Sequence, residues 1–343
     1  MRAQSLLERG DVAGALDDFE RAAMMQHAPD AEMGLVRAAL QDGQYRRALA
    51  FAAHTAGGHL TAADAGALYA WLLRMGGQRA LAERVLADTL TRVPGEPVSS
   101  AVFAAFAAPL PLATGLLLQP PHRMAPWPTM LGGQPPPLAG TRLVSGAALV
   151  GEGSVAVAPL AALRGLNPSR LWVRNGLGQT TEVAIDRTNA TLESAGIALL
   201  RLKAALDPGA LPPADLREPF AGTPGYALQF ADTGDSTWPW LRQGFLGGPD
   251  LGSGRRRLGF DADGGTQGAA VLDAGGRLVG LTLREAGQPT TWLPAAAWRA
   301  LAIAPPAAQA SAPAAPTVPR VLVAPDVIYE AGLRIALQVL AAD

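Results

Sequence analysis

The position of the histidines limits the acid–base chemistry of this chain. There are four, and all of them lie within the first 122 residues: His27, His54, His59 and His122. The chain has no cysteine, which excludes thiolate nucleophiles, disulfides and zinc–sulfur sites. Two ligands on one helical face need i, i+4 spacing; His54 and His59 are five residues apart, and we identify no partner ligands beside them. The sequence therefore predicts no metal site, and it implies no cofactor.

Beyond residue 140, hydroxyl groups remain as candidate nucleophiles, but no imidazole is available to activate them. The only lysine of this region is Lys203. A pair between Lys203 and either Thr266 or Ser253 is the one catalytic combination that the composition leaves open.

Glycines followed by alanines recur at a fixed interval in the first third of the chain. Gly10, Gly43 and Gly77 are 33 and 34 residues apart. The segments that follow them resemble the second helix of the tetratricopeptide repeat, whose period is about 34 residues. The resemblance implies paired antiparallel helices over residues 1–107, with residues 98–107 as a capping helix.

Arrays of this kind usually bind peptides on a concave face lined by first helices. In phase with the repeat, that face would present four side chains: Arg37, Gln41, Trp71 and Arg74. The alternative is that Trp71 belongs to the core and that so short an array only docks onto the neighbouring domain. Repeat two departs from the family pattern, because Glu32 stands where an aromatic residue is expected.

Proline dominates residues 108–139 and, with alanine, residues 304–319. Proline removes backbone donors and fixes φ, so both segments are expected to be extended linkers. The apolar stretch over residues 101–118 is long enough for a membrane span. It contains Pro109 and Pro111, however, and we expect no span in this chain.

Short apolar runs separated by glycine fill residues 140–303, which is typical of an all-β barrel or sandwich. Their amino-acid sequence resembles that of trypsin-like proteases of the HtrA type. The matching segments are "GSVAVAPLAAL" (153–163), "GIALLRL" (196–202) and "GTQGAAVLDAGGRLVGL" (265–281). The expected fold class is therefore multidomain α plus β, with an N-terminal helical repeat and a C-terminal trypsin-like double barrel.

The resemblance also assigns the positions of the catalytic triad. Leu160, or its neighbour Pro159, occupies the histidine position, Gly196 the aspartate position and Gln267 the serine position. The triad needs an imidazole, a carboxylate and a hydroxyl, so the resemblance implies a pseudoprotease and not an enzyme. The turn formed by Gly265, Thr266, Gln267 and Gly268 keeps two family glycines. It is either a relic oxyanion site or only a tight barrel turn.

The last segment, residues 320–343, is expected to dock through a strand or helix. Asp326 follows a proline and is placed to cap a helix. An apolar stripe with helical spacing follows it: Ile328, Ala331, Ile335 and Val339. The stripe must be covered, either by this chain or by a partner.

Composition narrows the remaining functions. Hydrophobic residues make up 49% of the chain and the net charge is −1, so a nucleic-acid partner is not expected. We expect a non-catalytic scaffold or assembly adaptor that binds other proteins. The alternatives are a chaperone-like binder that uses the old cleft and an active peptidase with non-standard residues. The resemblance implies the periplasm or cell envelope of a Gram-negative bacterium, and the short first helix fits a removed leader. Partner identity and oligomeric state stay open.

Overall fold

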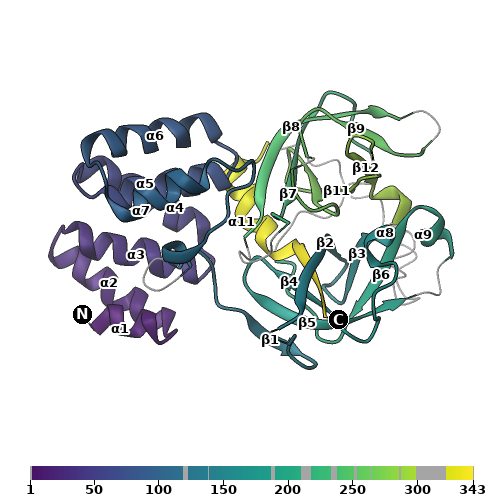
Figure 1. Ribbon diagram of the computed structural model, residues 1–343, viewed down its shortest axis with the longest axis horizontal. Helices are drawn as coiled ribbons and strands as arrows, with labels where there is room; N and C mark the ends of the chain where they lie inside the picture. Colours follow the sequence, from purple (N-terminus) through teal and green to yellow (C-terminus); the bar gives the residue numbers. More distant parts are fainter. Residues whose placement is uncertain are drawn as a thin grey trace, which may run out of the picture.

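The computed structural model of the chain describes residues 2–118, 123–137, 139–186, 190–209, 218–232, 238–250, 253–262, 264–285, 287–298 and 322–342. It has a helical half and a β half that lie side by side (Figure 1). The linker expected at residues 304–319 lies outside the described residues. No helix in the described ranges is long and apolar enough to cross a membrane.

The helical half is a stack of antiparallel pairs. Its helices are α1 (Arg2–Glu8), α2 (Val12–Met25), α3 (Pro29–Gln41), α4 (Tyr45–Gly58), α5 (Ala63–Met75), α6 (Arg79–Arg92) and α7 (Pro97–Ala105). The second helices begin at residues 12, 45 and 79, which reproduces the period read from the sequence. Helix α7 packs on α5 and α6 at the end of the stack, where we expected a capping helix.

The repeated glycines form the turns that precede the second helix of each pair. Gly10, Gly43 and Gly77 have φ angles of 81°, 76° and 84°, so they form left-handed turns that L-residues avoid. Other glycines allow neighbouring helices to pack closely against one another. An added Cβ would overlap the Phe19 ring at Gly34 and the Thr89 side chain at Gly66.

The β half contains two closed barrels. The first barrel includes β2 (Thr141–Val150), β3 (Val155–Pro159), β4 (Leu171–Asn175), β5 (Gln179–Asp186) and β6 (Ile197–Leu202), and β5 pairs with β6 to close it. The second barrel consists of β7 (Pro224–Gln229), β8 (Trp240–Pro249), β9 (Arg256–Leu258), β10 (Ala270–Asp273), β11 (Leu278–Leu283) and β12 (Thr291–Pro294). The short helices α8 (Leu160–Leu163) and α9 (Ala190–Ser194) flank β3 and β6. The expected fold class, a helical N-terminal region followed by a trypsin-like double barrel, is confirmed.

The C-terminal segment completes the first barrel. Strand β13 (Ala336–Ala342) lies between β2 and β4 and pairs antiparallel with both. All seven of its residues are buried. The expected helical stripe is therefore wrong at Val339, because helix α11 (Pro325–Ile335) ends before it. The run "ALQVLAA" has two strand neighbours whose backbone groups it satisfies, which favours the extended form.

The proline-rich linker is a packed belt rather than a free tether. Leu110, Ala113, Leu117 and Met124 are buried. Strand β1 (Thr129–Gly132) pairs parallel with β5 at the sheet edge, and the 3₁₀ turn η1 (Gly115–Leu117) packs on α7.

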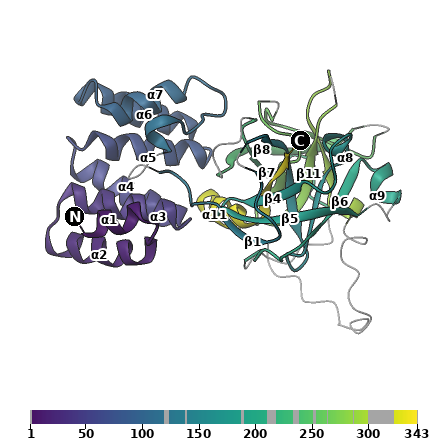
Figure 2. The same cartoon turned by 60° about the horizontal axis from the view of Figure 1, so that its bottom comes forward.

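Helix α11 lies between the two halves in both views (Figures 1 and 2). Tyr329 of α11 is completely buried, and its hydroxyl donates to the Pro239 carbonyl at 2.7 Å. Its ring packs edge-on against Tyr45 of α4, with centroids 4.4 Å apart, and Trp238 lies 6.2 Å from it. Of the expected tail stripe, Ile328 and Ile335 are buried and Ala331 is half-buried. The tail is thus covered by this chain itself.

Two further contacts join the halves. Trp71 of α5 meets Trp240 of β8 at a centroid distance of 5.4 Å. Gln243 Nε2 donates to the Gly77 carbonyl at 2.7 Å. The halves are therefore joined by direct packing as well as by the linker.

Candidate functional site

The three segments expected to hold a catalytic triad meet between the barrels. Leu160 begins α8 directly after β3, and its N–H donates to the Gly196 carbonyl at 2.9 Å. The third segment reaches β2, where the Gly146 N–H donates to the Gln267 carbonyl at 2.7 Å. Gly268 is so close to β2 and β3 that an added Cβ would lie 2.8 Å from Pro159 Cδ.

This meeting point carries no catalytic side chain at the three positions. Leu160 offers an aliphatic group, Gly196 no side chain and Gln267 an amide. Gly196 has a φ of 81°, a conformation that a substituting residue adopts only with strain. An amide is neither a nucleophile nor a base near neutral pH, so these three side chains do not supply the imidazole, carboxylate and hydroxyl of a Ser–His–Asp triad.

The turn at residues 265–268 is held by bonds within the barrel. The Thr266 N–H donates to the Phe230 carbonyl and the Gly268 N–H to the Thr282 carbonyl, both at 2.9 Å. Gly268 has a φ of 87°, and an added Cβ would overlap the Gly146 carbonyl oxygen. Any anion binding would therefore fall to the N–H groups of Gly265 and Gln267.

The linker covers one side of this turn. Buried Leu110 packs against Gly265 so closely that an added Cβ there would overlap its side chain. Pro109 lies 3.4 Å from the corresponding Cβ position of Gly264. The turn at residues 265–268, for which the sequence suggested a relic oxyanion site, thus packs against the linker on one side.

Among the contacts of the described residues, Lys203 is not paired with either Thr266 or Ser253. Lys203 Nζ pairs with Glu182 Oε2 at 3.4 Å. Thr266 Oγ1 lies 3.3 Å from the Phe230 carbonyl oxygen, and Ser253 Oγ lies 3.1 Å from Asp250 Oδ2. Each group is engaged with its own neighbours.

The four residues expected on a concave binding face do not form an open surface. Gln41, Trp71 and Arg74 are only 4%, 1% and 5% exposed. Trp71 lies in the contact with the β half, and Arg74 donates to Glu83 at 2.8 Å and to the Ala108 carbonyl at 3.2 Å. The expectation of a peptide-binding face needs correction, because the linker and β8 occupy it.

Arg37 is the fourth member of that set and is half-buried. Its guanidinium contacts Asp64 Oδ2 at 2.5 Å. Burial lowers the pKa of the Arg37 guanidinium, while the neighbouring carboxylates, chiefly Asp64, oppose that change. The ion pair therefore joins α3 to α5.

A groove remains open beside this ion pair, between α3, α5 and α7. Its cavity has a volume of about 540 Å³. It combines carboxylates with apolar side chains: Asp30, Met33, Asp64, Glu96, Val98 and Leu116. A surface of this composition suits a segment that carries both apolar and basic residues.

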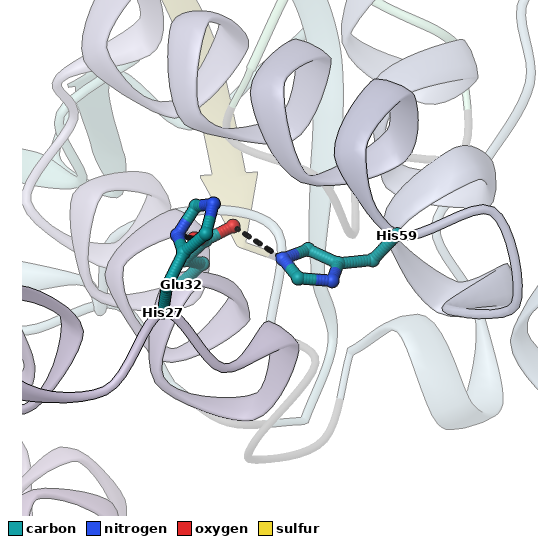
Figure 3. Close-up of side chains that lie close together, drawn as sticks. All are labelled: His27, Glu32 and His59. Atoms are coloured by element: carbon teal, nitrogen blue, oxygen red, sulfur yellow. Dashed lines mark ion pairs between the residues drawn. The ribbon is translucent and has the colours of Figure 1, made fainter.

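A second cluster was not expected from the sequence. His27, Glu32 and His59 point toward one another from the loop before α3, the first turn of α3 and the end of α4 (Figure 3). Glu32 Oε1 lies 2.6 Å from His27 Nδ1, and Glu32 Oε2 lies 3.6 Å from His59 Nε2. Spacing within one helix did not reveal the group, because its members come from three elements. The available signal was Glu32 itself, a carboxylate at a position where the repeat pattern favours an aromatic residue.

Comparison with known proteins agrees with the fold. Residues 140–281 match the family model of the trypsin-like peptidase domain. Among curated proteins none matches this chain. One similar solved structure is described as the MamO protease domain from Magnetospirillum magneticum in its apo form. It is 18% identical, with a TM-score of 0.35, and the match covers 48% of this chain and 88% of that one.

Proposed function

We propose that this chain is a non-catalytic adaptor that binds another protein, built from a tetratricopeptide-type array and a pseudoprotease domain. One observation carries the proposal. The three triad positions hold Leu160, Gly196 and Gln267, and every histidine of the chain precedes residue 123. The β half therefore lacks the imidazole that serine-protease chemistry requires, whatever the alignment.

The tetratricopeptide identity is supported by the geometry of the pairs. Helices α3, α5 and α7 begin at residues 29, 63 and 97, and the intervening helices have the same phase. Small residues, Gly34 and Gly66, lie where neighbouring helices approach most closely. Both features are what stacked repeats of about 34 residues need.

The contacts favour an adaptor over a chaperone-like binder. A chaperone that uses the old cleft needs that cleft open, whereas Leu110 already packs on the Gly265 turn. The groove between α3, α5 and α7 is an open cavity lined by carboxylates as well as apolar side chains. A site of fixed chemistry fits one partner better than many clients.

Catalysis is tested with a fluorophosphonate probe and a casein digest on the purified chain. We expect neither labelling nor cleavage. Specific labelling that competes with a serine-protease inhibitor would contradict the proposal.

Partner binding is tested by a pull-down from the native host. Leu116→Asp places a charge on a groove residue that is 39% exposed, and Met24→Asp is a matched control on a residue that is 80% exposed on α2. We expect one stoichiometric partner that is lost with Leu116→Asp and kept with Met24→Asp. Many weak clients that ignore both substitutions would support the chaperone alternative.

The proposed location is the periplasm or cell envelope of a Gram-negative bacterium. It follows from the HtrA-type resemblance, and the absence of cysteine is compatible with it. Fractionation of the native host tests it, and recovery of the chain only in the cytoplasm would contradict it.

A further inference from the structure

Three of the four histidines of this chain gather around one buried carboxylate. His27, His54 and His59 all lie within ion-pair distance of Glu32, at 2.6, 3.6 and 3.6 Å. The rings of His54 and His59 lie 5.3 and 5.2 Å from that of His27. The carboxylate comes from α3 and the imidazoles come from the chain on either side of it, so the fold assembles this group from separate segments.

Glu32 is buried to a degree that requires compensation. It is 3% exposed, and an ionised carboxylate in such a place is costly unless charge and hydrogen bonds offset the loss of water. Thr55 Oγ1, itself buried, lies 2.9 Å from Glu32 Oε2 and fixes the carboxylate in position. Packing does not explain this residue, because the repeat pattern favours an aromatic side chain here.

His59 also has a buried polar atom whose loss of water is not compensated by a hydrogen bond within the described part of the chain. Its Nε2 atom is buried and has no hydrogen-bond partner among the described residues, although Glu32 Oε2 is 3.6 Å away. A buried ring nitrogen aimed at a carboxylate is costly when nothing lies between them. A cation between the two atoms would satisfy both of them.

We propose that His27, Glu32 and His59 bind a divalent transition-metal ion, with zinc as the first candidate. The ligand atoms of the three side chains all lie within 4.8 Å of one another. Tetrahedral zinc with bonds of about 2.0–2.2 Å places its ligand atoms roughly 3.3 Å apart. The distance from His27 Nδ1 to Glu32 Oε1 is 2.6 Å and that from His59 Nε2 to Glu32 Oε2 is 3.6 Å, one on either side of that value.

The donor set selects the class of metal. Two imidazoles and one carboxylate suit zinc and its first-row neighbours, whereas calcium and magnesium prefer oxygen ligands. Thr55 has the position of the outer residue that commonly orients a metal-binding carboxylate.

The site would have a structural effect on the array. It ties the loop after α2 to the first turn of α3 and to the end of α4. Metal bound only by the folded chain stabilises it through mass action. The ion would therefore hold the first two helix pairs together.

The test uses the full chain, freed of metal with a chelator. Zinc binding is measured by calorimetry, and cobalt(II) is added separately because its visible absorption reports a low-coordination site. We expect one ion per chain and a higher melting temperature with zinc. Glu32→Gln and His59→Ala should each weaken zinc binding at least tenfold and abolish the cobalt absorption, while helical circular dichroism is retained.

His122→Ala is the control, because it removes the fourth imidazole of the chain and changes none of the three proposed ligands. It should bind zinc as the wild type does. Three results would overturn the proposal: a folded wild-type chain that binds no zinc, zinc binding that is unchanged in Glu32→Gln or His59→Ala, or binding that is lost in His122→Ala. If a cluster variant fails to fold, the cobalt spectrum of the wild-type chain decides, since histidine and carboxylate ligation without sulfur has its own absorption.

Discussion

At the scale of single residues, the three positions that the resemblance assigns to a triad hold other residue types. Leu160 and Gly196 are joined by a backbone hydrogen bond of 2.9 Å, and together with Gln267 they offer no imidazole, carboxylate or hydroxyl. Restoration of one group cannot rebuild an activity that depends on all three.

Gln267→Ser provides a direct test of this point. We expect no fluorophosphonate labelling above background, because no imidazole in the β half can take the serine proton. The wild-type chain and an active serine protease are the two references. Labelling of the variant would show that another base reaches residue 267, and Lys203 would then need to be examined.

Gly268 makes a separate residue-scale prediction that concerns stability. An alanine there has a positive φ and would overlap the Gly146 carbonyl oxygen. The backbone strain alone costs about 1–2 kcal/mol, and the overlap adds to it. Gly254→Ala is the matched control, since Gly254 has a φ of 66° with no atom near the added Cβ.

Urea unfolding of both variants separates the cost of backbone strain from the cost of the steric overlap. We expect Gly268→Ala to lower the free energy of unfolding by clearly more than Gly254→Ala does. Equal losses would mean that the turn at residue 268 can move away from β2.

At the scale of elements, the main result is that the tail belongs to the first barrel. Strand β13 pairs with β2 over residues 336–342 and with β4 over residues 337–341. A barrel without it would have two unpaired strand edges, which proteins avoid. The segment that looked like a docking appendage is therefore part of the core.

Leu337→Ala tests the contribution of this strand. Leu337 is completely buried, and truncation of a buried leucine costs about 2–5 kcal/mol. Leu322→Ala, at a residue that is 77% exposed, should change stability by no more than about 0.5 kcal/mol. Denaturant unfolding measures both, and similar small effects would mean that β13 adds little to the barrel.

The sequence predicted local elements better than distant pairings. The repeat period located the helices, and the segment "GIALLRL" (196–202) contains β6. The tail was misjudged, because Val339 continues a helical spacing and only its distant partners β2 and β4 decide for a strand. The histidine cluster was missed for the same physical reason: His27 and His59 are 32 residues apart and meet only after α3 and α4 pack.

At the scale of the whole molecule, the two halves are joined by buried aromatic side chains. Tyr45 from the repeats and Tyr329 from α11 meet there, and Trp238 lies beside both. Arg46 extends the contact to solvent through an ion pair with Asp326 at 2.9 Å. The C-terminal segment thus belongs to both the first barrel and the junction. We therefore expect the helical half to lose the surface against which it packs whenever the barrel unfolds.

The junction gives the molecule a defined response to alkaline pH. Burial raises the pKa of the Tyr45 and Tyr329 phenols, and nearby Asp326 adds to the effect at Tyr45. Unfolding exposes both phenols, whose ordinary pKa is about 10. Above that pH the unfolded chain releases protons that the folded chain keeps, so these two phenols contribute no pH dependence well below pH 10 and lower the stability as the pH rises above about 10.

The expected decline is about 1.4 kcal/mol per pH unit for each phenol. Tyr329→Phe removes one phenol and should flatten the decline by about that amount. Below about pH 10 it should lower stability by a constant amount, because the hydrogen bond to Pro239 is lost. Urea unfolding between pH 7 and 11 measures both effects. Identical slopes for the variant and the wild-type chain would mean that Tyr329 can ionise in the folded state, which requires that the two halves separate before the barrel unfolds.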